Sequence, residues 1–143
     1  MGSINGSALS NVVSTGAFTI PLMKKVGYHK DFAGAVEASA SVGGQILPPI
    51  MGASAFIMAE TTGLPYSTIA LAALLPAILY YLGVIAQVHF RAGRRDLKGI
   101  AKENLPAVKE VLKARGHMLL PIVFLIFLLI RNVPVGYAAA YTI

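Results

Sequence analysis

The 143-residue sequence contains no cysteine and no tryptophan, and charged residues make up only 13% of it. Without cysteine the chain cannot form disulfides, zinc–thiolate sites or thiol nucleophiles. Soluble domains carry roughly 25% charged residues, whereas this chain is 56% hydrophobic. That composition leaves too little polar surface to coat a water-soluble globule, and it also excludes an intrinsically disordered chain. The composition therefore indicates a membrane protein.

Lysine and arginine are absent from residues 32–90, where Glu37 and Glu60 are the only charged side chains. Within this window, residues 68–90 are apolar enough and, at about 1.5 Å per residue, long enough to cross the hydrocarbon core as a helix. Pro76 predicts a mild kink, which neighbouring helices make tolerable. Tyr80 and Tyr81 fall in mid-span, so we expect protein or a cavity beside their hydroxyls. A buried helix of a large soluble protein is the alternative, and the flanking charge asymmetry disfavours it.

Residues 31–60 form a second apolar stretch, but its middle is interrupted. Gly43 and Gly44 relax the backbone, and Pro48 and Pro49 remove two successive N–H donors. Unpaired backbone groups are costly in hydrocarbon, so such breaks survive where they line a cavity or are covered by protein. We therefore predict a broken transmembrane helix, the best sequence indication of a transporter's binding site. The alternative is a loop between two short helices outside the membrane.

The arm before this break carries small residues every four positions, at Ala35, Ser39 and Gly43. Small residues at that spacing share a helix face and allow close backbone approach, so this face is predicted to pack against another helix. Glu37 lies about two turns into the arm. We expect it near the membrane interface, and a direct functional role is the less favoured reading.

The first 21 residues are polar without being charged: they contain two Asn, four Ser and two Thr among glycines and small apolar residues. Amide, hydroxyl and freed backbone oxygens are hard ligands that suit a small alkali cation, and half-helix ends add their dipoles. A plain Ser/Gly loop is an equally acceptable reading of this composition alone.

The basic residues form two blocks, one at residues 24–30 and one at residues 91–115, and the linker at residues 61–67 has none. The positive-inside rule places both blocks in the cytoplasm and the linker outside, so the two intervening spans have consistent parity. Residues 91–116 hold eight basic and three acidic residues. They suit an amphipathic helix on the inner leaflet, with a solvated helix as the alternative. Nucleic-acid binding is disfavoured, because the charges lie between apolar stretches.

Five segments follow from these patterns. They are a hairpin arm and tip with a basic turn (1–30), the broken transmembrane helix (31–60), an outer turn and transmembrane helix (61–90), the basic amphipathic linker (91–116), and the truncated start of further transmembrane segments (117–143). The last contains a run of 13 apolar residues that Arg131 closes. We expect a multi-pass all-α membrane protein, represented here as a fragment.

The motifs along residues 1–90 carry a family likeness. They are Gly6-Ser7, Ser10-Asn11-Val12, Thr15-Gly16, Thr19-Ile20-Pro21, Gly27-Tyr28, Gly43-Gly44, Pro48-Pro49, Met51-Gly52-Ala53 and Met58-Ala59-Glu60. In order and spacing they resemble the large membrane subunit, the dicarboxylate-type permease, of tripartite ATP-independent periplasmic (TRAP) transporters, particularly its fused-permease branch. Ser10 departs from the pattern, since many members have alanine there.

The resemblance implies an elevator-type transporter with inverted repeats, each with a re-entrant helical hairpin and a broken helix. It also implies sodium-coupled import of organic acids across the bacterial or archaeal cytoplasmic (inner) membrane. The partners would be a periplasmic substrate-binding protein, a small membrane subunit that is separate or fused, the rest of the permease chain, and lipid. Sodium is the coupling ion, and no cofactor is expected.

Mapped onto this chain, the ion and substrate site takes residues from the hairpin tip and from the helix break. The predicted site residues are Ser7, Ser10, Asn11, Thr15, Gly16, Gly43, Gly44, Gln45, Pro48, Pro49 and Met51. Those predicted to hold sodium are Asn11, Thr15, Gly16 and Gly44. An anionic substrate would meet N–H groups at the half-helix ends.

Two other functions compete with transport. An enzyme is disfavoured, because His29, His89 and His117 have no carboxylate at ligand or triad spacing and no hydrolase, metalloprotease or P-loop motif is present. A non-transporting fragment or a membrane scaffold is the stronger competitor, because only half of an inverted-repeat architecture is present.

Overall fold

The computed structural model describes residues 1–97, 116, 120–131, 133 and 137. The chain divides into two units, residues 1–99 and residues 100–143, and each is described by itself. The predicted amphipathic linker lies outside the described residues from Lys98 to Arg115, as do residues 117–119 and most of those after Arg131. Every regular element in the described residues is helical, which confirms the predicted all-α class for this part of the chain.

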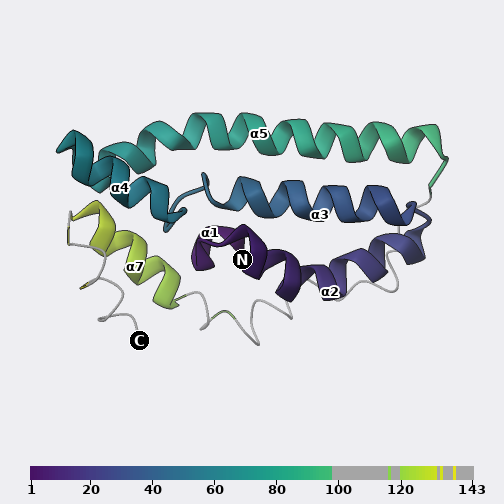
Figure 1. Cartoon of the computed structure of the whole chain (residues 1–143), viewed down its shortest axis with the longest axis horizontal. Helices are drawn as coiled ribbons and strands as arrows, with labels where there is room; N and C mark the ends of the chain where they lie inside the picture. The colour runs from purple at the N-terminus through teal and green to yellow at the C-terminus, as the bar shows by residue number, and fades with distance from the viewer. Residues whose placement is uncertain (98–115, 117–119, 132, 134–136, 138–143) are drawn as a thin grey trace. The chain divides into compact units, whose positions relative to one another are not determined.

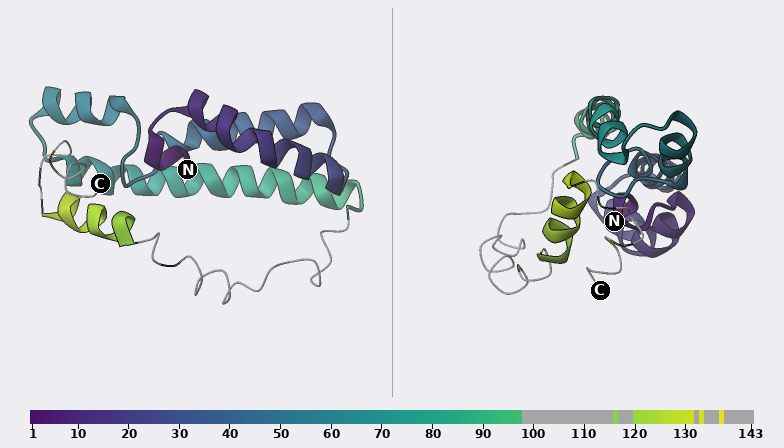
Figure 2. Two further views of the ribbon diagram at one scale, coloured as in Figure 1. Left: turned by 90° about the horizontal axis from the view of Figure 1, so that it is seen from below. Right: turned by 90° about the vertical axis from the view of Figure 1, so that its left-hand side faces the viewer.

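The first unit contains a short helix followed by four longer ones. They are α1 (Gly2–Asn5), α2 (Ala8–Val26), α3 (Lys30–Gly44), α4 (Ala53–Thr62) and α5 (Tyr66–Arg94). Helix α3 lies between α2 on one side and α5 on the other, and both run antiparallel to it (Figure 1). Helix α1 contacts α2 and α3, while α4 contacts α5. Figure 2 shows the same unit from two further directions. Helix α3 is therefore the central element of this unit.

The interruption predicted within residues 31–60 has a defined position in the structure. Helix α3 continues through Gly43 and ends at Gly44, and helix resumes only at Ala53. The connecting segment contains a cis peptide bond between Pro48 and Pro49. Its two ends are tied together, because the Gly52 N–H donates to the Gln45 carbonyl oxygen at 2.7 Å. The segment at residues 45–52 is called the break below.

Helix α5 is the one helix among the described residues that is long and apolar enough to cross a membrane. Its 29 residues span roughly 43 Å. The side chains that it leaves exposed include Leu71, Leu75, Leu79, Leu82 and Ile85. In water they would form a large apolar patch, whereas lipid or further helices can cover them.

The two mid-span tyrosines of α5 bind the backbone of α3. The Tyr80 hydroxyl donates to the Ser39 carbonyl oxygen and the Tyr81 hydroxyl to the Ala40 carbonyl oxygen, both at 2.9 Å. Their rings lie against Gly43. The prediction that protein neighbours would meet these hydroxyls is confirmed.

Basic side chains gather where α2 ends, α3 begins and α5 ends, which is one end of the three-helix arrangement (Figure 1). The guanidinium of Arg91 lies 5.3 Å from the centre of the Phe32 ring, a cation–π contact between α5 and α3. Residues 91–95, the described part of the second basic block, therefore lie at the same end of this unit as the first block. Their sidedness remains a prediction.

The predicted packing face of α3 is wrong in one respect. Ala35 is exposed, and the buried positions before Gly43 are Ala33, Glu37 and Ser41. These three are also four residues apart but lie two residues out of register with the predicted stripe, so spacing alone did not identify the face toward α2. Of the predicted stripe, Gly43 is buried, and it faces α5.

The second unit contributes one described helix, α7 (Leu120–Ile130), whose 11 residues are all apolar. The guanidinium of Arg131 lies 5.3 Å from the centre of the Phe127 ring. At roughly 16 Å the helix is shorter than the membrane core, so it tests no part of the predicted further spans.

Candidate functional site

The turn between α1 and α2 packs against the break. The Ile50 N–H donates to the Ser3 carbonyl oxygen at 3.2 Å, and the Gln45 side-chain amide donates to the Gly6 carbonyl oxygen at 3.4 Å. Gly6 adopts a φ of 64°, a left-handed conformation that glycine reaches without a side-chain clash. The polar N-terminal segment and the glycine–proline break, 40 residues apart in sequence, therefore form one contact region.

Glycines bring the two backbones to van der Waals distance in this region. A Cβ atom on Gly44 would lie 2.7 Å from the Gly2 Cα, and one on Gly6 would lie 2.6 Å from the Met51 carbonyl oxygen. Both positions therefore exclude any side chain. Met51 is itself buried and has a φ of 64°.

Asn11, in the second turn of α2, is buried and faces α3. Its side chain is 7% exposed, and its Nδ2 donates to the Ser41 hydroxyl at 2.8 Å. The Oδ1 atom is buried and has no hydrogen-bond partner in the described part of the chain. Buried amide oxygens are rarely left unpaired. An unpaired, electron-rich oxygen at this place fits a cation or a ligand N–H group.

A polar cluster lies between α2 and α3, and Glu37 is at its centre. Glu37 was not among the predicted site residues. It is 7% exposed. The Thr15 hydroxyl donates to its Oε1 at 2.6 Å, the Thr19 hydroxyl contacts its Oε2, and the Ser41 hydroxyl lies 3.5 Å from Oε1. Gly16 makes room for it, since a Cβ there would lie 3.1 Å from the Glu37 Cγ. No basic side chain of the described residues forms an ion pair with it.

The other predicted residues occupy several environments. Ser7 caps α2 by accepting the Ser10 N–H at 3.3 Å, and Ser10 is exposed. Gly43 faces the rings of Tyr80 and Tyr81, away from Asn11. The structure thus brings together two groups, a buried polar cluster on α2 and α3 and a backbone contact at the break. The cluster comprises Asn11, Thr15, Gly16 and Ser41 with Glu37; the contact comprises Gly44, Gln45 and Met51 with residues 2–6.

Tyr66 holds the break from the side of α5. Its hydroxyl reaches the carbonyl oxygens of Pro49, at 3.1 Å, and Ile50. These carbonyls lie in a segment without helical hydrogen bonds, so the tyrosine supplies a donor that the local backbone lacks.

Tyr66→Phe is expected to destabilise the full-length protein by about 1–3 kcal/mol, because the carbonyl oxygens of the break lose their donor. The same change at Tyr28 is the matched control, since its hydroxyl donates to the Val88 carbonyl oxygen over a longer 3.4 Å. Thermal unfolding of the purified protein should show the larger loss for Tyr66→Phe. Equal losses would mean that the tyrosine does not support the break.

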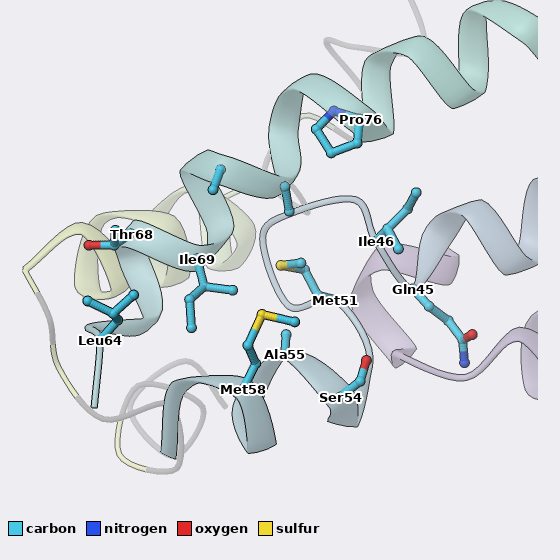
Figure 3. A pocket seen from close by; sticks show the side chains of 12 residues that line it. Gln45, Ile46, Met51, Ser54, Ala55, Met58, Leu64, Thr68, Ile69 and Pro76 are labelled. Carbon is cyan, nitrogen blue, oxygen red and sulfur yellow. The ribbon is translucent and has the colours of Figure 1, made fainter. Parts of the chain in front are cut away.

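A cavity of about 390 Å³ lies beside the break, between α4 and the first half of α5 (Figure 3). Its lining is mostly apolar and includes Met51, Met58, Ile69 and Pro76. No charged side chain lines it, so this cavity does not suit a carboxylate.

The whole chain, residues 1–143, matches the family model described as the DctM component of the tripartite ATP-independent periplasmic transporter. No solved structure matches.

Among the curated relatives, the C4-dicarboxylate TRAP transporter large permease protein DctM of Vibrio cholerae is 29% identical over 78% of this chain and 24% of its own length. The isethionate TRAP transporter permease protein DctMQ of Oleidesulfovibrio alaskensis is 26% identical over 86% of this chain and 19% of its own length. The uncharacterized protein YgiK of Salmonella typhimurium is 27% identical over 92% of this chain and 29% of its own length.

The chain thus spans about a quarter of the length of these relatives. A family match over all of its residues, on a helical fold, leads to one conclusion: the chain belongs to the DctM family of large TRAP transporter permeases.

Proposed function

We propose that this chain is part of the moving unit of a sodium-coupled secondary transporter that imports organic acids. The single observation that carries the proposal is the unpaired Oδ1 of Asn11, buried next to an interrupted helix. Asn11 and Thr15 side-chain oxygens, with carbonyl oxygens around Gly16 and Gly44, would hold the ion. These are neutral hard oxygens, which suit an alkali cation.

The two half-helices at the break supply dipoles of opposite sign. Helix α3 ends at Gly44, so the carbonyl groups of its last turn concentrate partial negative charge there and favour a cation. Helix α4 begins at Ala53 without a side-chain cap. The Ala55 N–H donates to the Gly52 carbonyl oxygen, so the N–H groups of Ala53 and Ser54 are those that would meet a carboxylate. A cation and an organic anion can therefore bind side by side, and each lowers the electrostatic cost of the other.

No covalent chemistry is needed for this activity. In the proposed mechanism the hairpin of α1 and α2 and the broken helix move as one rigid unit past a static scaffold, and they carry ion and substrate across the cytoplasmic membrane. The contacts between Ser3 and Ile50 and between Gly6 and Gln45 support a single unit. The rest of the permease, a small membrane subunit and a periplasmic binding protein would complete the transporter. The names of the relatives, which include C4-dicarboxylate and isethionate permeases, support an organic anion as substrate.

Asn11→Ala in the full-length permease, reconstituted with its partners, tests this proposal. We expect the half-saturating sodium concentration for uptake to rise about tenfold or more, because the ion loses a ligand worth at least about 1.4 kcal/mol. The measurement is initial uptake against sodium concentration at constant ionic strength. Asn5→Ala is the control, because Asn5 is exposed and its amide oxygen only accepts the Ser7 N–H.

The alternative, a scaffold or inert fragment without transport activity, is favoured by the limited span of the chain relative to its relatives. It predicts that Asn11→Ala leaves sodium-dependent uptake by the full-length permease unchanged in rate and in sodium affinity. That result would overturn the site assignment.

A further inference from the structure

The hydroxyls of Thr15 and Thr19 each face two acceptors. The Thr15 hydroxyl lies 2.7 Å from the Asn11 carbonyl oxygen and 2.6 Å from Glu37 Oε1. The Thr19 hydroxyl lies 3.1 Å from the Thr15 carbonyl oxygen and also contacts Glu37 Oε2. A hydroxyl has a single proton, so each threonine donates either to its own helix or to the carboxyl group of Glu37.

The two arrangements have different electrostatic consequences. When both hydroxyls donate to Glu37, they solvate the carboxyl group. When both donate back to α2, their lone pairs face the two carboxyl oxygens, and four electron-rich oxygens then point toward one another. With the carboxyl group ionised, the second arrangement is stable only if a positive charge lies among these oxygens.

We propose that Glu37 is the charged ligand of a sodium site whose hydroxyl ligands are Thr15 and Thr19. This inference rests on the proposed function, and it deepens it by adding a formal negative charge to a site otherwise built from neutral oxygens. The cation switches the two hydroxyls from Glu37 to the carbonyl oxygens of α2, and the cluster thus has one hydrogen-bond arrangement with the ion and another without it.

Burial and charge both favour a monovalent ion. Glu37 is 93% buried, since its exposed fraction is 7%, and no basic side chain of the described residues pairs with it. A lone carboxyl group inside a membrane protein is expensive and is usually paired or functional. One sodium ion neutralises a single carboxylate. Calcium would leave a surplus charge and requires six to eight oxygen ligands.

Ser41 connects this cluster to Asn11. It accepts from Asn11 Nδ2 at 2.8 Å, and its hydroxyl lies 3.5 Å from Glu37 Oε1. Thr15 and Thr19 belong to α2, whereas Glu37 and Ser41 belong to α3. An ion held among them therefore ties the hairpin to the broken helix, which is what sodium coupling of a moving unit requires.

Sodium-dependent thermal stabilisation tests the proposal without relying on transport. Full-length permease in detergent is titrated with NaCl, with choline chloride keeping the ionic strength constant, and the unfolding temperature is recorded. A ligand that binds only the folded state stabilises it by RT ln(1 + [L]/Kd), so the unfolding temperature rises with the logarithm of the sodium concentration once this exceeds the dissociation constant. The variants are Glu37→Gln, which keeps the shape and removes the charge, and Thr19→Val, which removes the hydroxyl. Thr61→Val is the matched control, because that exposed hydroxyl donates only to carbonyl oxygens of its own helix.

We expect the sodium concentration that produces a given rise in unfolding temperature to increase about tenfold or more in Glu37→Gln and Thr19→Val, and to stay unchanged in Thr61→Val. Thr19→Ser, which restores a hydroxyl, should recover most of the affinity. If Glu37→Gln fails to fold, Thr19→Val and Thr19→Ser alone decide.

The outcomes separate this inference from the proposed function. Unchanged sodium affinity in Glu37→Gln or Thr19→Val, with Asn11→Ala impaired, overturns the role of Glu37 and leaves the Asn11 site standing. Impaired Glu37→Gln with unaffected Asn11→Ala supports the carboxylate site and overturns the Asn11 site. If sodium neither raises the unfolding temperature of the full-length permease nor drives its uptake, both the Glu37 site and the Asn11 site are overturned.

Discussion

Gly44→Ala is expected to abolish sodium-dependent uptake by the full-length permease and to destabilise it more than alanine does elsewhere on α3. The added Cβ would lie 2.7 Å from the Gly2 Cα, 2.8 Å from the Gly2 carbonyl carbon and 3.1 Å from the Ser3 nitrogen. All three are backbone atoms, so no rotamer change relieves the overlap. The N-terminal turn must move off the end of α3, which separates the hairpin from the break. Overpacking of this kind costs about 1–3 kcal/mol or more.

Gly34→Ala is the matched control on the same helix. Nothing lies within 4 Å of a Cβ at Gly34. Alanine is favoured over glycine in a helix interior by about 1 kcal/mol, so this variant should be neutral or slightly more stable. Gly44→Ala should therefore lower the unfolding temperature and abolish uptake, whereas Gly34→Ala should keep both. Similar behaviour of both would show that the contact between α1 and α3 is not part of the working fold.

The sequence predicted the break because its signal is local. Paired glycines followed by paired prolines disfavour a helix whatever surrounds them, and α3 does end at Gly44. The neighbours of Tyr80 and Tyr81 were predictable for a similar reason, since a hydroxyl in an apolar helix needs an acceptor nearby. The ends of α5 differ by only a few residues from the predicted span, because charge and apolar length alone determine it.

The role of Glu37 was not predictable in the same way, because its partners belong to another helix. Thr15 and Thr19 are four residues apart and face one side of α2, but only the packing of α2 on α3 brings their hydroxyls to the carboxyl group. The usable signal was the isolation of Glu37, one of two charged residues in residues 32–90. Combined with the Thr15–Thr19 spacing, that isolation would have favoured a buried polar cluster over an interfacial position.

The contact at the break depends equally on features that composition cannot reveal. The predicted tip residue, Asn11, lies within α2, and the turn that touches the break is formed by residues 2–7. Gly2 and Gly6 resemble ordinary loop glycines in the sequence. Their close approach to Gly44 and Met51 is a property of the assembled backbone. The same contact can be tested from the N-terminal side.

Gly6→Ala is expected to impair uptake and stability for two separable reasons. Its φ of 64° is costly for alanine, by about 1–2 kcal/mol. In addition, the new Cβ would lie 2.6 Å from the Met51 carbonyl oxygen, which belongs to the break. The expected result is a loss of sodium-dependent uptake in reconstituted full-length permease, together with a lower unfolding temperature.

Gly63→Ala separates the cost of the left-handed backbone conformation from the cost of the steric clash. Gly63 has nearly the same φ, 68°, but nothing lies within 4 Å of a Cβ there. It therefore carries the conformational cost alone, and its loss of stability should be the smaller of the two. The difference between the variants measures the contact of the hairpin with the break. A difference near zero would mean that the contact between Gly6 and the break adds nothing to stability, which would count against the proposal that these two segments move as one unit.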